Sequence, residues 1–156
     1  MLTAPSSADL GPNASDKTRE AAHRAATEFG FTSGQIVQEF YYDDDVDMTL
    51  RTALEEITGE ELEDEDYTNT TDGAIVWWRA EDAEEDDLAD LLVDASANLD
   101  DGGDIWVLTP KAGRAGHVAA ADVEAAAGIA GMHASASLAA GRDWMAMRLV
   151  VKARSM

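Results

Sequence analysis

Hydrophobic and polar residues follow one another along the chain in two patterns, one typical of helices and one typical of strands. Apolar residues at intervals of three and four predict one amphipathic helix over residues 15–29 and a second over residues 46–58. Gly30 and Gly59 follow these segments directly, as glycine commonly does at the C-terminus of a helix. The first half of the chain is therefore predicted to contribute two helices that each end at a glycine.

A third amphipathic helix is predicted over residues 88–99, where leucines and one alanine recur at helical intervals. We place the acidic residues 84–87 in its first turn, because the helix dipole favours negative charge there. The sequence "DDGG" at residues 100–103 is expected to end this helix. A fourth helix, built of small residues, is predicted over "AADVEAAAGIAGM", residues 120–132, where small side chains allow close packing on a sheet.

Runs with the composition of strands lie between these helices. They are "GQIVQEFYY" at residues 34–42, "GAIVWWR" at residues 73–79 and "DIWVLTP" at residues 104–110. Residues 133–153 have the character of two strands joined by a tight turn, which predicts a C-terminal hairpin. The acidic segment at residues 60–67 fits either a short edge strand or a loop, and both alternatives remain open.

The order of these elements predicts a single Rossmann-like α/β domain. Strands that alternate with helices imply right-handed crossovers and a mostly parallel sheet with helices on both faces, and the closing hairpin adds an antiparallel edge. With 156 residues, of which 46% are hydrophobic, the chain is long enough for one packed core. We expect residues 14–154 to form this domain and residues 1–13, which contain Pro5 and Pro12, to form a disordered leader.

The formal net charge of −21 is distributed unevenly along the chain. Residues 43–104 hold 24 acidic residues and only two basic ones, Arg51 and Arg79, whereas residues 105–156 carry a small positive charge. An acidic middle repels nucleic acid and anionic membrane surfaces, so we expect neither as a partner. The acidic region is a solvated surface, a face for a basic protein partner or an adaptation to high salt, and these alternatives remain open.

The composition also excludes classes of chemistry. The absence of cysteine excludes disulfides, thiol catalysis and thiolate metal sites. The N-terminus lacks the features of a signal peptide, and no apolar run approaches the about 20 residues that span a membrane, so we expect a cytoplasmic protein. Asp43, Asp45 and Asp47 have the spacing of a calcium loop, but Met48 and Leu54 stand where that loop needs glycine and glutamate. We therefore expect no bound metal.

Three stretches of the sequence resemble an actinobacterial family known only as a domain of unknown function. They are "GQIVQEFYYDDDVD", "IVWWR" and "DDGGDIWVLTPKAGRAGHV", and the last contains the most specific part. The resemblance covers about residues 27–152 and implies no known activity. The order of elements is also similar to a shortened Rossmann-like methyltransferase core, in which a reversed last strand is inserted beside the fifth.

The turn after the first predicted strand argues against the methyltransferase cofactor. Nucleotide-binding turns need glycine so that the backbone can approach the ligand, yet "FYYDDDVD" at residues 40–47 contains none. We therefore expect no cofactor and predict a non-catalytic binding or regulatory module on a degenerate methyltransferase-like fold. The alternative is a divergent S-adenosylmethionine-dependent methyltransferase, or another enzyme with a site at the C-terminal edge of the sheet.

Candidate binding residues follow the predicted strands, at the edge where open α/β sheets bind ligands. The candidates are Lys111, Arg114, His117, Arg79, Tyr42 and Trp78. The basic members of this set suit a small anionic ligand or an acidic side chain of a protein partner. They also suit internal ion pairs with the acidic turns, which we favour slightly, and both alternatives remain open. Trp77 and Trp78 should point to opposite faces of the sheet as core residues, unless Trp78 forms a stacking wall for a ligand.

Overall fold

The computed structural model describes residues 16–151, so the predicted leader at residues 1–13 lies outside the described residues. Helices and strands alternate through the described range up to a final pair of strands. In chain order the elements are α2 (Asp16–Glu28), β1 (Val37–Phe40), α3 (Met48–Thr58), β2 (Thr71–Trp77), the 3₁₀ helix η1 (Ala80–Glu84), α4 (Leu88–Ser96), β3 (Leu99–Pro110), α5 (Ala120–Ile129), β4 (Met132–Ala140) and β5 (Trp144–Val151).

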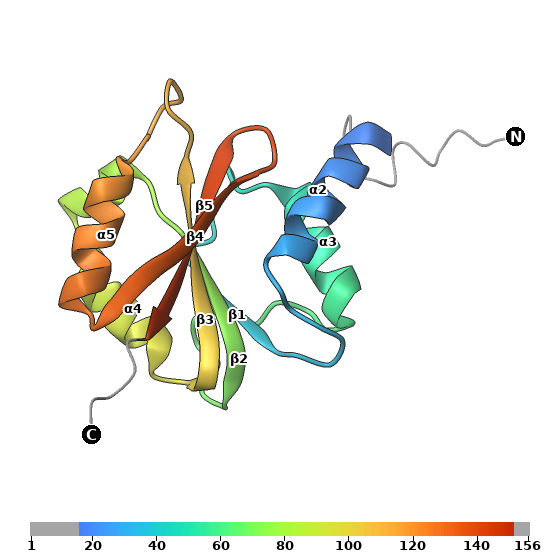
Figure 1. The fold of residues 1–156 in the computed structure, drawn as a ribbon, viewed down its shortest axis with the longest axis horizontal. Helices are drawn as coiled ribbons and strands as arrows, with labels where there is room; N and C mark the ends of the chain where they lie inside the picture. The colour runs from blue at the N-terminus through green and yellow to red at the C-terminus, as the bar shows by residue number, and fades with distance from the viewer. Residues whose placement is uncertain (1–15, 152–156) are drawn as a thin grey trace, which may run out of the picture.

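The strands form one mixed sheet in the order β1-β2-β3-β5-β4. Strands β1, β2 and β3 run parallel, whereas β5 lies antiparallel between β3 and β4. Helices α2 and α3 lie on one side of the sheet and α4 and α5 on the other (Figure 1). The predicted α/β class, with a mostly parallel sheet and a C-terminal antiparallel hairpin, is confirmed.

Each face of the sheet has its own hydrophobic core. Trp77 and Trp106 belong to the core under α2 and α3, where Trp106 stacks on Phe29 with ring centroids 4.3 Å apart. Trp78 belongs to the opposite core, under α4 and α5. The neighbouring tryptophans therefore point to opposite faces, as the alternation of side chains along a strand predicts. Because both faces are covered, residues 74–77 of β2 and 105–108 of β3 are continuous buried apolar runs.

The predicted boundary between the third helix and the following strand was wrong. Helix α4 ends at Ser96, and Leu99 begins β3, where it pairs with Thr71 of β2. The "DDGG" segment lies inside β3 and does not end a helix. A side chain at Gly103 would place its Cβ 2.8 Å from the carbonyl oxygen of Asp72, so glycine here permits a close approach of strands.

The acidic segments also differ from the prediction. Of residues 84–87, only Asp87 caps α4, by accepting hydrogen bonds from the backbone amides of Ala89 and Asp90, and the other three precede the helix. This capping satisfies amides that have no partner within the helix, which fixes the helix start at Leu88. The segment at residues 60–67 is a loop with one parallel bridge, between Gln38 and Glu63.

Candidate functional site

The turn after β1 stands at the edge of the sheet where the parallel strands end. Its first residue, Tyr41, has φ 63°, in the left-handed region that favours glycine. A tyrosine in this conformation costs on the order of 1 kcal/mol, so its surroundings must hold it there. The Tyr41 amide donates to Glu65 at 2.8 Å, its carbonyl oxygen accepts from Arg79 at 2.8 Å, and its hydroxyl donates to Asp86.

Arg79, directly after Trp78, closes this turn against the end of β2. Its side chain is buried, and Nη1 donates to the carbonyl oxygens of Tyr41 at 2.8 Å and Trp77 at 2.9 Å. Nε donates to the Asp45 carboxylate at 3.0 Å, and Nη2 donates to the same carboxylate. We call Arg79, Tyr41, Asp45 and Asp86 the Arg79 network.

The electrostatics of the Arg79 network keep the guanidinium charged. Burial by itself lowers the pKa of Arg79, but the hydrogen bond to Asp45 and the negative charges of Asp45, Asp82 and Asp43 together raise it above its ordinary value. A charged guanidinium with four hydrogen bonds therefore lies over the carboxyl ends of β1 and β2. The turn contains no glycine, and glycine is the residue that lets the backbone come close to a bound nucleotide-type ligand.

Tyr41 gives the network a measurable pH dependence. Burial, the hydrogen bond to Asp86 and the negative charges of Asp86, Asp82 and Glu65 raise the pKa of Tyr41 above its ordinary value of 10.0. A group whose pKa is raised by folding contributes stability below its unfolded pKa and loses that contribution as the pH rises above it. We expect Tyr41→Phe to lower the free energy of unfolding by about 1 kcal/mol at pH 8, and by less at pH 11.

Urea unfolding of both proteins at the two pH values measures this difference. Tyr42→Phe is the matched control, because its hydroxyl contacts only the sulfur of Met48, at 3.7 Å, among the described residues. A Tyr41→Phe difference that grows between pH 8 and pH 11 would contradict the contribution assigned to the hydroxyl.

The basic loop, residues 111–118, makes its own contacts within the chain. Lys111 Nζ donates to the carbonyl oxygen of Gly141 at 3.0 Å, and its amide donates to that of Asp143 at 2.8 Å. Arg114 pairs with the Asp143 carboxylate at 3.1 Å, with both side chains about half exposed. His117 Nδ1 lies 2.9 Å from the carbonyl oxygen of Pro110. The loop is thus held against the turn between β4 and β5.

The structure places the predicted basic residues along one edge but does not gather them into one cluster. Arg79 engages the turn after β1, whereas Lys111 and Arg114 engage the turn between β4 and β5. Tyr42 is half exposed and lies under the guanidinium of Arg51, 4.8 Å from its ring centre. Binding of an anion by this set stays a prediction, and internal partners exist for each cation in it.

A second buried ion pair was not foreseen from the sequence. Glu39 of β1 is 6% exposed and accepts hydrogen bonds from Arg51 Nε and Nη2, each at 2.7 Å. The Trp77 indole donates to the same carboxylate at 2.8 Å. The hydrogen bond to Glu39 raises the pKa of Arg51, outweighing the effect of burial. This contact joins α3 to the sheet below the turn, and it leaves the carboxylate of Glu39 fully engaged.

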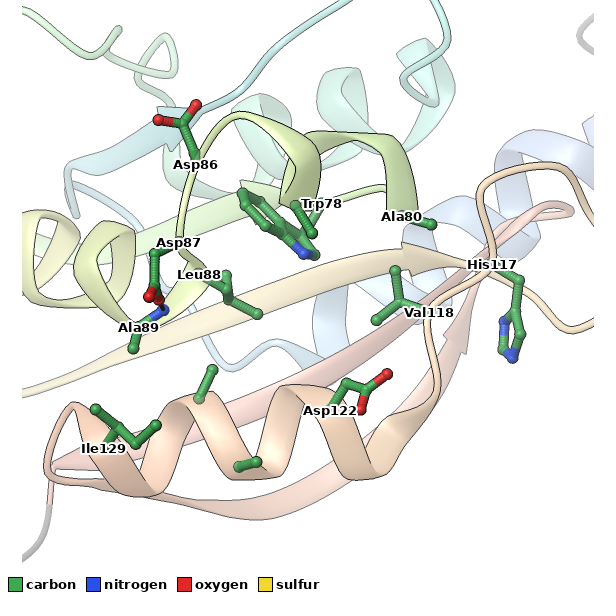
Figure 2. Close-up of a pocket in the computed structure, with 13 residues that line it drawn as sticks. Trp78, Ala80, Asp86, Asp87, Leu88, Ala89, His117, Val118, Asp122 and Ile129 are labelled. Carbon is green, nitrogen blue, oxygen red and sulfur yellow. Dashed lines mark hydrogen bonds between the residues drawn. The ribbon is translucent and has the colours of Figure 1, made fainter.

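A concave site lies between α4 and α5. A cavity of about 550 Å³ separates the start of α4 from α5, and we call it the α4–α5 groove. Trp78, Leu88 and Val118 provide apolar walls from three segments of the chain (Figure 2). The carboxylates that line it are Asp86, Asp87 and Asp122, and His117 stands at one end.

Sequence reasoning reached only part of this groove. Trp78 and His117 were among the candidate residues, whereas Ala125 and Ile129 of α5 were not. A signal was present, because eight of the ten residues of α5 are Ala, Val, Gly or Ile and these residues are not confined to one face of the helix. In the structure, Ile129 is nevertheless 80% exposed.

Residues 16–151 contain neither a metal-binding cluster nor a membrane-spanning helix. No group of three or more His, Asp or Glu side chains in this range is arranged to hold a metal ion. No helix in the same range is long and apolar enough to cross a membrane.

Solved structures define the class of fold. A S-adenosylmethionine-dependent methyltransferase from Aquifex aeolicus superposes with a TM-score of 0.56 at 12% identity, covering 95% of this chain and 98% of the other. Magnesium protoporphyrin IX methyltransferase from Synechocystis PCC 6803, with bound SAM, gives a TM-score of 0.52 at 12% identity, and the match covers 87% of this chain and 79% of the other. The chain therefore has a methyltransferase-type Rossmann fold.

The sequence itself places the chain in a narrower group. Residues 26–153 match the family described as "Protein of unknown function (DUF3052)", and the chain belongs to that family. It is 42% identical over 129 residues to "Uncharacterized protein Mb2263c" of Mycobacterium bovis and "Uncharacterized protein Rv2239c" of Mycobacterium tuberculosis, covering 83% of this chain and 79% of each relative. The resemblance seen in the sequence to an actinobacterial family of unknown function is confirmed.

Proposed function

We propose that this protein acts in the cytoplasm by binding a protein partner, as a regulatory or adaptor module, without S-adenosylmethionine. The observation that carries the proposal is the Arg79 network. A cofactor of this type needs an open turn after the first strand, where glycine lets the backbone approach the ligand. The guanidinium of Arg79 lies there instead, bonded to the carbonyl of Tyr41 and the carboxylate of Asp45.

The geometry of the turn supports this proposal in a second way. Tyr41 keeps the left-handed backbone conformation that a glycine turn would use, but it carries a large side chain packed on Trp78, with ring centroids 5.4 Å apart. We call the space beyond the carboxyl end of β1, where Arg79 lies, the crevice. Opening the crevice for a ligand would break charge-assisted hydrogen bonds of a buried guanidinium, which are among the stronger hydrogen bonds in proteins. We infer that the fold is retained as a scaffold for binding.

The alternative function is that of a divergent methyltransferase. Its support is the likeness of the fold to methyltransferases, one of which was solved with bound SAM. Likeness of fold does not by itself imply likeness of function, because unrelated functions share the same scaffold.

Calorimetric titration of S-adenosylmethionine into the full chain separates the two functions. We expect no saturable heat up to millimolar cofactor, because the crevice is occupied by side chains of the chain itself. Saturation at micromolar cofactor would overturn the proposal in favour of the methyltransferase.

The partner-binding half of the proposal has its own test. Since the chain carries a net charge of −21, we expect association with a basic protein partner that weakens as salt screens the charges. Affinity capture from cell extract at low and high ionic strength, followed by mass spectrometry, checks this expectation. Recovery of no salt-sensitive partner counts against it.

A further inference from the structure

The outer side of α5 is apolar and is not covered by any described element. Ala121, Ala125, Gly128 and Ile129 recur at intervals of three and four along this side, and all four are exposed. A soluble helix normally presents charged and polar residues on its outer side, and a helix that is apolar all round is normally buried. Helix α5 is not apolar all round, because Asp122 and Glu124 are exposed on it, but the strip between these two residues is apolar and uncovered by the described elements.

Trp78 supplies an unused hydrogen-bond donor on the groove side of α5. Its side chain is 2% exposed, and its indole nitrogen has no hydrogen-bond partner among the described residues. In Figure 2 the nitrogen lies on the edge of the ring turned toward Val118. The indoles of Trp77 and Trp106, by contrast, both donate to protein oxygens. The Trp78 nitrogen is not among the fully buried side-chain atoms of the described residues that lack a partner, so it is open to the groove and can donate to an occupant there.

The rim of the groove is negatively charged. Asp86 and Asp87 lie on the α4 side and Asp122 on the α5 side (Figure 2). Glu85, next to Asp86 in sequence, is exposed as well. An apolar floor with carboxylates on both sides is complementary to a segment that carries apolar anchors flanked by lysine or arginine.

We propose that the α4–α5 groove binds an amphipathic helix of another protein, with lysine or arginine residues beside its apolar anchors. Helix α5 has 10 residues and is about 15 Å long, enough to pair with a helix that presents anchors over two turns. Because the exposed Ala121 and Gly128 extend the apolar surface beyond the lining residues Ala125 and Ile129, the site fits a helix better than a small molecule. The proposal rests on the proposed function, since it names the partner class of a binding module.

A second copy of this chain is a poorer occupant than a basic helix. Two copies would bring together the same acidic rims, and each copy carries a net charge of −21. Like charges placed opposite each other across an interface disfavour association. The expected partner is therefore a different, basic protein.

The probe for this site is an 18-residue peptide of leucine and lysine, with leucines at helical intervals of three and four. A shuffled peptide of the same composition, without that periodicity, controls for general attraction to an acidic protein. We expect the periodic peptide to bind the full chain at least tenfold more tightly than the shuffled one. In two-dimensional NMR of ¹⁵N-labelled protein, the Trp78 indole signal should shift while the Trp106 indole signal stays in place.

Point variants test whether the peptide occupies the groove. Ile129→Ser and Ala125→Gln change the apolar surface without changing the charge, and each should weaken binding of the periodic peptide about tenfold. Val93→Ser is the matched control, because Val93 is also exposed, at 52%, but lies on α4 outside the groove. Its affinity should stay within twofold of the wild type.

Three results would overturn the inference. The first is equal binding of both peptides, and the second is an equal loss in Val93→Ser and Ile129→Ser. The third is a dimer in sedimentation that Ile129→Ser disrupts, which would assign the face to a second copy. The cofactor titration does not depend on these outcomes. The groove can therefore fail to bind the peptide while S-adenosylmethionine still does not bind, and the groove can bind the peptide even if S-adenosylmethionine binds.

Discussion

Replacement of Arg79 by methionine is expected to lower the free energy of unfolding by about 3 kcal/mol. Methionine keeps much of the length of the side chain but removes all donors of a group that is 5% exposed. The carbonyl oxygens of Tyr41 and Trp77 lose their guanidinium partner, and Asp45 loses its cation. The strained turn at Tyr41 also loses the contact that closes it against β2. Urea unfolding of the purified variant measures the change.

Arg114→Met is the matched control for this prediction. Arg114 also pairs with a carboxylate, that of Asp143, but both side chains are about half exposed. Exposed ion pairs contribute little to stability because water and salt screen them, so we expect a change below about 0.5 kcal/mol. Equal losses in the free energy of unfolding of Arg79→Met and Arg114→Met would contradict the prediction that the buried ion pair stabilises the fold more than the exposed one.

Replacement of Gly73 by alanine is expected to cost about 2 kcal/mol of stability. Gly73 lies in β2, and an added Cβ would stand 2.2 Å from Cε1 of Phe31. Phe31 is 7% exposed and packs in the core beside Phe29, so its ring cannot move aside without opening that core. Thermal and urea unfolding of the variant measure the loss.

Gly128→Ala makes the same chemical change as Gly73→Ala, but we expect it to raise the stability of the protein. Gly128 lies in α5, and an added Cβ would meet no atom within 4 Å. Alanine restricts the unfolded chain and favours the helix, so we expect a gain of about 0.5 kcal/mol. A Gly73→Ala variant as stable as Gly128→Ala would show that the Phe31 contact imposes no constraint on β2.

Periodicity predicted most of the fold because it reports which face of each element is buried. The apolar run at residues 73–79 predicted both the strand and the opposite orientations of the Trp77 and Trp78 rings. The end of α4 could not be placed in this way. Residues 100–103 have the composition of a loop, yet they extend β3 because Leu99 finds a partner in Thr71, far away in the sequence.

The Arg79 network could not be predicted from the sequence, because its members are also far apart along the chain. Tyr41 and Arg79 are 38 residues apart, and nothing in either segment shows that the guanidinium turns back over β1. The composition did hold one hint. Arg51 and Arg79 are the only basic residues among 24 acidic ones in residues 43–104, and each of them forms a buried or half-buried ion pair. A rare cation in an acidic segment is a good candidate for a structural partner.

The closed crevice beyond β1 is tested most directly by NMR of the ¹⁵N-labelled full chain during a titration with S-adenosylmethionine. The signals to follow are the backbone amides of Tyr41 and Asp45 and the side-chain Nε–H of Arg79, which report on the crevice itself. With the crevice filled by the Arg79 network, these signals should stay in place up to millimolar cofactor. Saturable shifts of the same signals at micromolar cofactor would contradict the closed crevice and show that the protein binds S-adenosylmethionine.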